Sequence, residues 1–320
     1  MQPRILSAVS ALLLLCAQSH AADAKAKVDD KTKAPGQRPP TEANVRYGPH
    51  ERNVVDFYKA ESDKPTPLVF YIHGGGWLNG DKARVGDLEK YLAAGISVVS
   101  INYRYTSQAQ EVSPPVKAPL HDAARALQFV RSKAKEWNID KTRIGATGGS
   151  AGACSSLWLD FHPDLADPKS KDPIARESTR LLCAAVNVAQ TTLDPKQMKE
   201  WTPNSRYGGH AFGFKGDKEK KLSQFDEFLA KRDTILPWIA EYSPYALVTS
   251  DDPPVYLYYS TAPALGQDMK DPTHTANFGV KLQEHLREMK VESELVYPGA
   301  PDVKHKSISE YLIGKLSAKK

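Results

Sequence analysis

Gly148-Gly149-Ser150-Ala151-Gly152 directly follows a short apolar run at residues 144–147, and it is the most informative motif of the chain. Glycines two residues before and after a serine fit a sharp turn from a buried strand into a helix, where side chains at those positions would collide with neighbouring backbone. Apolar residues then recur at helical spacing, at Ala151, Cys154, Leu157, Trp158 and Phe161. The pattern predicts a nucleophile elbow at Ser150; the alternative is a glycine-rich turn with a surface serine.

A second glycine motif, His-Gly-Gly-Gly-Trp at residues 73–77, ends the apolar run at 67–72. Three glycines after a strand expose backbone amides. We expect Gly75 and Gly76, together with Ala151 after the serine, to direct N–H groups at an oxyanion. We expect His73 to hydrogen-bond within its own loop. Trp77 is either a wall of a substrate-binding pocket or a core residue.

Strand-like and helix-like segments alternate along the chain, which predicts a mostly parallel sheet covered on both faces. The expected strands are 53–58, 68–72, 96–103, 144–147, 181–189, 255–259 and 294–297, and the expected helices are 119–135, 151–161, 276–290 and 307–316. Both glycine motifs then lie at the carboxyl ends of strands, where such sheets bind ligands. Two segments interrupt the alternation, near 160–180 and 194–242, and we expect them to form a cap over the site.

The length and composition are typical of one globular domain, and the first residues have the pattern of a separate leader. Arg4 precedes an apolar run at 5–17 that is too short to span a bilayer, and Ser19-His20-Ala21 resembles a cleavage site. We therefore expect a signal peptide at 1–21, a disordered linker at 22–44 and a catalytic domain at 45–320, secreted or periplasmic and free of the membrane after cleavage. An uncleaved anchor is the alternative.

A net charge of +5 over 320 residues does not indicate a nucleic-acid partner. Cys154 and Cys183 are expected to be buried free thiols, although a disulfide between them is possible.

Taken together, these motifs resemble the α/β-hydrolase superfamily, and within it the hormone-sensitive-lipase and acetyl-esterase groups and the bacterial bifunctional feruloyl and acetyl-xylan esterases. The resemblance covers roughly residues 45–316. It rests on the two glycine motifs and on Asn102-Tyr103-Arg104, Pro119-Leu120-His121-Asp122, Ser243-Pro244 and Asp252-Pro253-Pro254-Val255. It implies an α/β-hydrolase fold with an inserted cap, and a catalytic serine, acid and histidine in that chain order.

The acid is expected after the strand at 255–259, where Asp268 and Asp271 are the candidates. In the families resembled, the acid is commonly followed by proline and lies about three turns before a leucine of the next helix. Asp271, with Pro272 and Leu282, fits that arrangement, and Asp268 remains the alternative.

The base is expected on a loop between the last strand and the final helix, where His305 is the histidine available. Other histidines are poorer candidates: His210 lies in the expected cap, His274 beside the acid and His285 within a helix pattern. Ser150, His305 and Asp271 would then form the triad of a serine carboxylic-ester hydrolase, with no metal or cofactor. The resemblance implies short acyl or carbohydrate-linked esters, either small-molecule or polysaccharide. The alternatives are a formamidase-type amide hydrolase and an inactive binding protein on the same fold.

Overall fold

The computed structural model describes residues 37–109 and 111–318, so the predicted signal peptide and residues 22–36 of the predicted linker lie outside the described residues. The rest of the linker prediction is wrong, because residues 42–44 belong to strand β1 (Glu42–Arg46). This strand pairs antiparallel with β2 (Val54–Tyr58). Most of its side chains are exposed, so the strand depends on backbone pairing and shows no apolar alternation in the sequence.

The sheet has eight strands in the order β1-β2-β4-β3-β5-β6-β7-β8. Beyond the antiparallel pairs of β2, all neighbours are parallel: β3 (Thr66–Ile72), β4 (Ser97–Ile101), β5 (Ile139–Gly149), β6 (Cys183–Asn187), β7 (Val255–Tyr258) and β8 (Ser293–Val296). Every strand expected from the sequence is present, and the predicted α/β-hydrolase architecture is confirmed.

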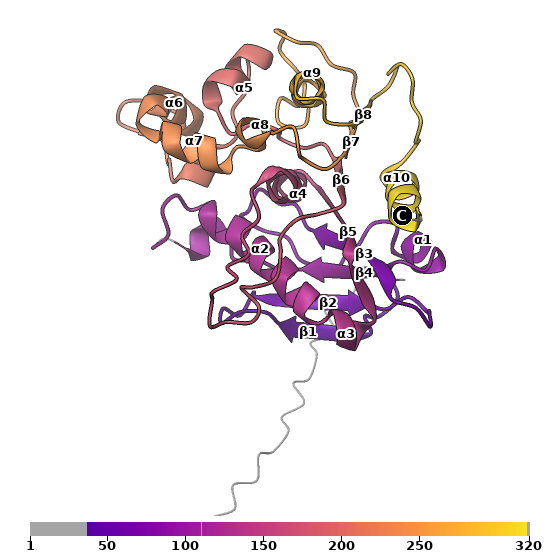
Figure 1. Ribbon diagram of the computed structural model, residues 1–320. Helices are drawn as coiled ribbons and strands as arrows, with labels where there is room; N and C mark the ends of the chain where they lie inside the picture. Colours follow the sequence, from indigo (N-terminus) through magenta and orange to yellow (C-terminus); the bar gives the residue numbers. More distant parts are fainter. Residues whose placement is uncertain (1–36, 110, 319–320) are drawn as a thin grey trace, which may run out of the picture. The chain divides into compact units, whose positions relative to one another are not determined.

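Helices cover both faces of the sheet, as the alternation predicted (Figure 1). Along β3, Leu68, Phe70 and Ile72 enter one core and Val69 enters the other, since successive side chains of a strand point to opposite faces. The first core is shared with α2 (Lys117–Ser132), the short α3 (Ala134–Trp137), α4 (Ala151–Phe161) and α9 (Asn277–Glu288), and the second with α1 (Leu88–Ala93) and α10 (Ile308–Ser317).

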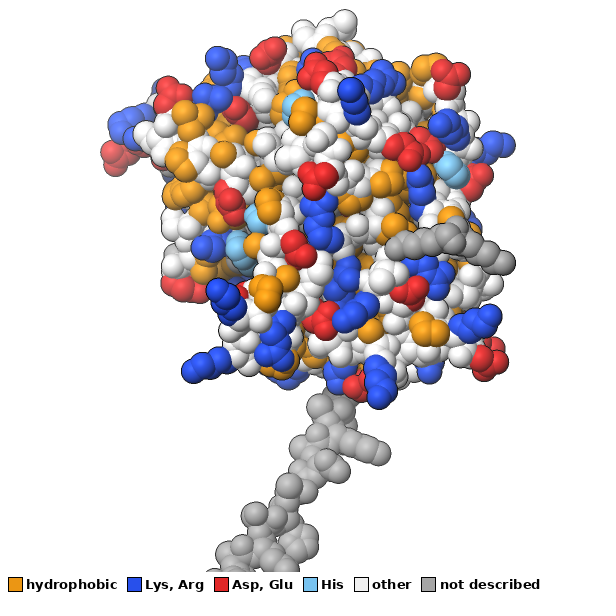
Figure 2. Space-filling view, viewed as in Figure 1, with side chains coloured by type: hydrophobic (Ala, Val, Ile, Leu, Met, Phe, Trp, Pro, Cys, Tyr) orange, Lys and Arg blue, Asp and Glu red, His pale blue; other side chains and the backbone are white. Residues whose placement is uncertain are grey.

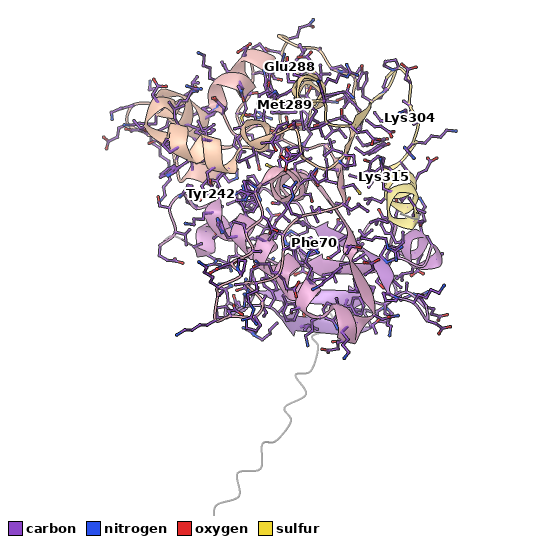
Figure 3. All side chains as sticks on the ribbon, viewed as in Figure 1. Phe70, Tyr242, Glu288, Met289, Lys304 and Lys315 are labelled. Carbon is purple, nitrogen blue, oxygen red and sulfur yellow. The ribbon has the colours of Figure 1, made fainter. Side chains whose placement is uncertain are left out.

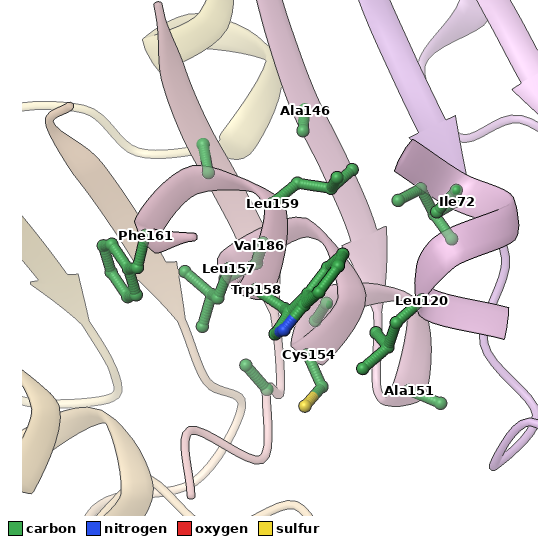
Figure 4. Close-up of a cluster of buried hydrophobic side chains, with 14 of the residues drawn as sticks. Ile72, Leu120, Ala146, Ala151, Cys154, Leu157, Trp158, Leu159, Phe161 and Val186 are labelled. Atoms are coloured by element: carbon green, nitrogen blue, oxygen red, sulfur yellow. The ribbon is translucent and has the colours of Figure 1, made fainter. Parts of the chain in front are cut away.

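Helix α4 is buried along its whole length, which fixes the position of its N-terminus. Figure 4 shows Leu157 and Trp158 of α4 among side chains of its neighbours. These include Ile72 of β3, Ala146 of β5, Val186 of β6 and Leu120 of α2. The position of Ser150, which precedes α4, is therefore fixed by the packing of that helix.

Residues 194–247 form a group of short helices, which we call the helical insertion (Figure 1). It comprises α5 (Pro195–Trp201), η3 (Gly209–Phe212), α6 (Gln224–Ala230), η4 (Arg232–Ile235), α7 (Leu236–Tyr242) and α8 (Pro244–Leu247). Phe212 and Phe228 stack with ring centroids 5.3 Å apart, and Phe225 packs on Phe228. These three phenylalanines thus pack the helices of the insertion against one another.

The second predicted cap segment, 160–180, is not a cap. The amide of Gln128 on α2 donates to the carbonyls of Leu165, Ala175 and Glu177, so the segment lies along α2. Glu177 also pairs with Lys141 near the start of β5, with Nζ and Oε2 3.0 Å apart. Nine residues of extended strand separate Lys141 from Ser150, about 30 Å, so the segment reaches the end of the sheet opposite the elbow.

Acidic and basic side chains are interspersed over the face shown in Figure 2, consistent with the small net charge. Cys154 and Cys183 are both free and buried, as expected. Within residues 37–109 and 111–318, no helix has the length and apolar content needed to cross a membrane.

Candidate active site

The turn at Ser150 has the strained geometry that the glycine pattern predicted. Ser150 has φ 54° and ψ −121°, a backbone conformation that residues other than glycine rarely adopt. A Cβ added at Gly148 would lie 2.3 Å from the carbonyl oxygen of Ile72, and one added at Gly152 would lie 2.1 Å from the same atom. The sharp strand-to-helix turn expected at Ser150 is therefore present, and both glycines are required by the close approach of β3.

Ser150, His274 and Asp271 form a continuous hydrogen-bonded series. Ser150 Oγ lies 2.9 Å from His274 Nε2, and His274 Nδ1 lies 2.8 Å from Asp271 Oδ2. Since a carboxylate can only accept, Nδ1 carries the proton and Nε2 of the neutral ring is left to accept from the serine hydroxyl. This is the geometry of a nucleophile, a base and a group that orients the base.

His305 does not belong to this series, and the prediction that it lies at Ser150 is wrong. Its Nδ1 lies 2.9 Å from Glu294 Oε1, and its ring contacts Tyr311 in the core on the other face of the sheet. The neighbouring Lys304 lies on the outer loop that leads into α10 (Figure 3). The histidine of the loop after β8 is thus paired with a glutamate of β8, separately from Ser150.

The sequence held a signal for the histidine that contacts Ser150. Asp271 and His274 are three residues apart in the unusually long segment between β7 and α9, residues 259–276, which we call the base loop. The loop turns back on itself, with the Thr273 amide donating to Asp271 Oδ1 at 3.1 Å, so that the carboxylate reaches the ring. In the sequence, the position of His274 beside Asp271 argued against it. In the structure, that closeness is what allows the carboxylate of Asp271 to contact the ring of His274.

Asp271, rather than Asp268, is the carboxylate that contacts His274, and it is open to solvent. Its side chain is 59% exposed and that of His274 is 34% exposed. Partial burial raises the pKa of Asp271, but the hydrogen bond and charge of His274 and the amides of Thr273 and His274 outweigh it and hold the pKa below its usual value. Among the described residues, no hydrogen bond joins Asp268 to His274.

The glycine loop (residues 73–77) passes directly against the elbow. A Cβ added at Gly74 would lie 2.6 Å from the Gly149 carbonyl oxygen and 3.6 Å from Ser150 Cβ. Gly75 and Gly76 have φ of 99° and 63°, and their amides donate to no acceptor among the described residues. Ala151 begins α4, so its amide belongs to the first turn, which lacks intrahelical acceptors. All three predicted donors therefore belong to segments beside Ser150.

His73 supports its own loop, as predicted. Its Nδ1 donates to the Gly74 carbonyl at 2.7 Å, its ring stacks on Tyr103, and Tyr103 Oη donates to the His73 carbonyl at 2.8 Å. Burial lowers the pKa of His73 to about 4, so the ring is neutral at neutral pH.

Trp77 and His210 hold the same loop from two sides. Trp77 is fully buried and its Nε1 donates to Ser155 Oγ on α4 at 3.0 Å, so Trp77 is a core residue and not the substrate-binding wall that was the other expectation. His210 of the helical insertion donates from Nε2 to the Gly76 carbonyl at 2.8 Å. This contact joins segments 134 residues apart, and no local sequence pattern indicates it.

The described residues contain no group of three or more His, Cys, Asp or Glu side chains arranged to hold a metal ion. The site just described thus consists of a strained serine, a histidine, a carboxylate and backbone amides.

Comparison with known proteins identifies the family. The sequence model of the BD-FAE family matches residues 55–265, about two thirds of the chain, and ends before Asp271 and His274. The probable carboxylic ester hydrolase LipM of Mycobacterium tuberculosis is 32% identical over 151 residues, which are 45% of this chain and 33% of that protein. The chain spans less than half the length of the curated relatives it matches.

Two solved structures share the fold. A truncated carbohydrate esterase from gut microbiota aligns with a TM-score of 0.65 and 20% identity, covering 88% of this chain and 100% of that one. The acetyl ester-xyloside bifunctional hydrolase from Caldicellulosiruptor lactoaceticus aligns with a TM-score of 0.60 and 22% identity, covering 82% of this chain and 87% of that one. From the family match over most of its length, supported by the shared fold, the chain belongs to the BD-FAE family, of α/β-hydrolase type.

Proposed function

We propose that this protein is a serine esterase that hydrolyses carboxylic esters with Ser150, His274 and Asp271. The observation that carries the proposal is the pair of contacts at 2.9 Å and 2.8 Å that joins the strained serine to the carboxylate through one imidazole. The relatives named as esterases support ester hydrolysis in particular.

In the proposed reaction, Ser150 Oγ attacks the ester carbonyl while His274 Nε2 takes the hydroxyl proton. The amides of Gly75, Gly76 and Ala151 stabilise the oxyanion, and the C–O bond to the alcohol breaks as His274 returns the proton to that oxygen. Water then attacks the acyl-enzyme with His274 again as base, which releases the acid and restores Ser150. Asp271 keeps Nδ1 protonated and stabilises the imidazolium that forms in each step.

The openness of the site favours esters with a bulky alcohol. His274 and Asp271 keep 34% and 59% of their side-chain surface exposed, so the side of the triad that faces solvent has room for more than a small alcohol. We therefore propose short acyl esters, including those linked to carbohydrate, as the substrate class. The printed descriptions of the two structural neighbours, a carbohydrate esterase and an acetyl ester-xyloside hydrolase, support this choice. The Arg4 and 5–17 pattern supports secretion or a periplasmic location.

A panel assay tests the proposal. Purified protein is given a chromogenic acetyl ester, a longer acyl ester, acetylated xylan and an anilide, and a serine-directed phosphonate is used to count reactive sites. The expected result is ester turnover with one phosphonate per chain, located on Ser150, and loss of both in Ser150→Ala. Turnover of the anilide with no ester turnover would favour the amide hydrolase. Absence of labelling and turnover would favour a binding protein.

A further inference from the structure

Because Asp271 and His274 lie on one loop, the position of that loop determines the distance between His274 and Ser150. Asp271 and His274 keep their mutual geometry locally, because they are three residues apart. The Ser150 Oγ to His274 Nε2 distance instead depends on how the whole base loop sits against the elbow. A segment of this length without regular structure needs specific ties to hold such a distance.

Residues 187–190, which leave the end of β6, touch both halves of the site. The Asn187 carbonyl accepts from the Ser150 amide at 3.0 Å. Three residues later, Gln190 Nε2 donates to the Thr273 carbonyl at 2.7 Å, on the residue that precedes His274. The same short segment thus contacts the nucleophile and the loop that carries the base.

The geometry fixes which end of the Gln190 amide faces the base loop. Nε2 lies 2.7 Å from the Thr273 carbonyl and 3.2 Å from the Val188 carbonyl, and two carbonyls can only accept. Gln190 is fully buried, and its Oε1 has no partner among the described residues. An unpaired buried acceptor such as Oε1 lowers stability. An apolar residue at position 190 would therefore be more stable, unless the hydrogen bond from Nε2 to Thr273 is needed.

The segment is also tied to the end of β7 and to the first residue of the base loop. The Val188 amide donates to the Tyr258 carbonyl at 2.8 Å, and Tyr259 Oη donates to the Ala189 carbonyl at 2.8 Å. Val188 has φ 46°, an uncommon conformation for a β-branched residue, which persists only where the surroundings hold it. Gln190 therefore projects from a backbone whose own position is determined.

We propose that Gln190 is a positioning residue that sets the distance between Ser150 and His274 by holding the Thr273 carbonyl. The proposal rests on the proposed function. Among the described residues, no hydrogen bond joins Gln190 to Ser150, His274 or Asp271; Gln190 acts through the base loop. Its loss lets the loop shift relative to the elbow while Asp271 and His274 stay paired.

The test compares Gln190→Met, which keeps the length and removes the donor, with Thr191→Val as matched control. Thr191 is also fully buried, and its Oγ1 donates to a backbone carbonyl, that of Phe278 in α9, at 2.9 Å. Gln190→Met loses the buried hydrogen bonds to Thr273 and Val188, and Thr191→Val loses the one to Phe278, but only the first variant loses a tie to the base loop. We expect Gln190→Met to lower kcat per phosphonate-titrated site by tenfold to a hundredfold, with KM changed less than about threefold. Thr191→Val should keep kcat within about twofold.

Two further measurements separate positioning from a structural role. The pH midpoint of kcat/KM should be unchanged in Gln190→Met, because the Asp271–His274 pair is local, and the phosphonate should still label one site per chain but more slowly. If Gln190→Met is insoluble, Gln190→Asn replaces it, since the shorter amide can no longer reach Thr273 from the same backbone. Wild-type kcat per titrated site in the soluble variant would overturn the positioning role. Activity retained by Ser150→Ala would instead overturn the proposed function.

Discussion

Asp271 and His274 lie on the same loop, three residues apart, with Oδ2 and Nδ1 at 2.8 Å. Their mutual geometry is therefore local. Tertiary structure has to supply only the position of this pair relative to Ser150. The loops after β7 and β8 are then not both needed to build the triad. This arrangement leads to predictions that differ from those for a base on the last loop.

The first prediction compares the two histidines. His274→Ala should lower kcat at least about a thousandfold, as Ser150→Ala should, because the serine loses its base. The double variant should be no worse than either single one, since the residues act together. His305→Ala should keep kcat within about twofold while losing about 1 kcal/mol of stability, because Glu294 loses its partner. Steady-state kinetics and thermal melting of each variant check these expectations. A His305→Ala protein that folds normally but has lost its activity would contradict the choice of His274 as the base.

The second prediction concerns the exposed carboxylate. Asp271→Asn should reduce kcat by about a hundredfold, less than is found for buried triad acids, because water can partly replace the lost acceptor at a side chain that is 59% exposed. Asp268→Asn, assayed beside it, should be nearly silent. A larger loss in Asp268→Asn than in Asp271→Asn would move the acid to Asp268.

The third prediction concerns the contact between the helical insertion and the glycine loop. His210→Ala removes the donor to the Gly76 carbonyl and should lower kcat by about tenfold, since the loop that carries the oxyanion amides is less restrained. His210→Gln keeps an N–H at similar reach and should recover most of the activity. Equal losses in the two variants, or a loss confined to KM, would argue that His210 contacts substrate instead.

A fourth prediction tests the packing of the elbow. Gly152→Ala places a Cβ 2.1 Å from the Ile72 carbonyl oxygen, so it should destabilise the fold by about 3 kcal/mol or prevent folding. Gly86→Ala is the matched control, because an added Cβ there meets nothing within 4 Å. Urea unfolding of the two proteins gives the comparison. Similar midpoints would show that the elbow tolerates a side chain at Gly152.

A fifth prediction follows from Asp160, a fully buried residue of α4 whose carboxyl oxygens have no hydrogen-bond partner among the described residues. Burial, reinforced by the charge of Asp252, raises its pKa well above the usual value. Above about pH 4 the unfolded chain loses this proton and the folded protein keeps it. The folded state then binds more protons, so stability falls as pH rises. Asp160→Asn should flatten the decline in Tm between about pH 5 and pH 8; an unchanged slope would assign the decline to other groups.

The sequence predicted those parts of the site that local sterics determine. Gly148 and Gly152 are needed wherever a strand turns this sharply beside Ile72, so the elbow could be read from five residues. Strand β1 was missed because backbone pairing holds it, and its largely exposed side chains show no alternation.

The base was missed for a different reason. The base was expected on the loop after the last strand, whereas the position of His274 depends on the path of the base loop, which distant contacts determine. Asn277 donates to the carbonyls of Trp201 and Ala264, and the Gly266 amide donates to the Trp201 carbonyl. Such ties join the loop to the helical insertion and bring His274 over Ser150, and no pattern in either segment reveals them.

The separate pairing of His305 with Glu294 leaves the connection between β8 and α10 without a part in the chemistry. At Gly299 in that connection, an added Cβ would meet no atom within 4 Å. We therefore expect residues 297–304 to accept changes of length and composition, including an inserted reporter peptide, without loss of ester turnover.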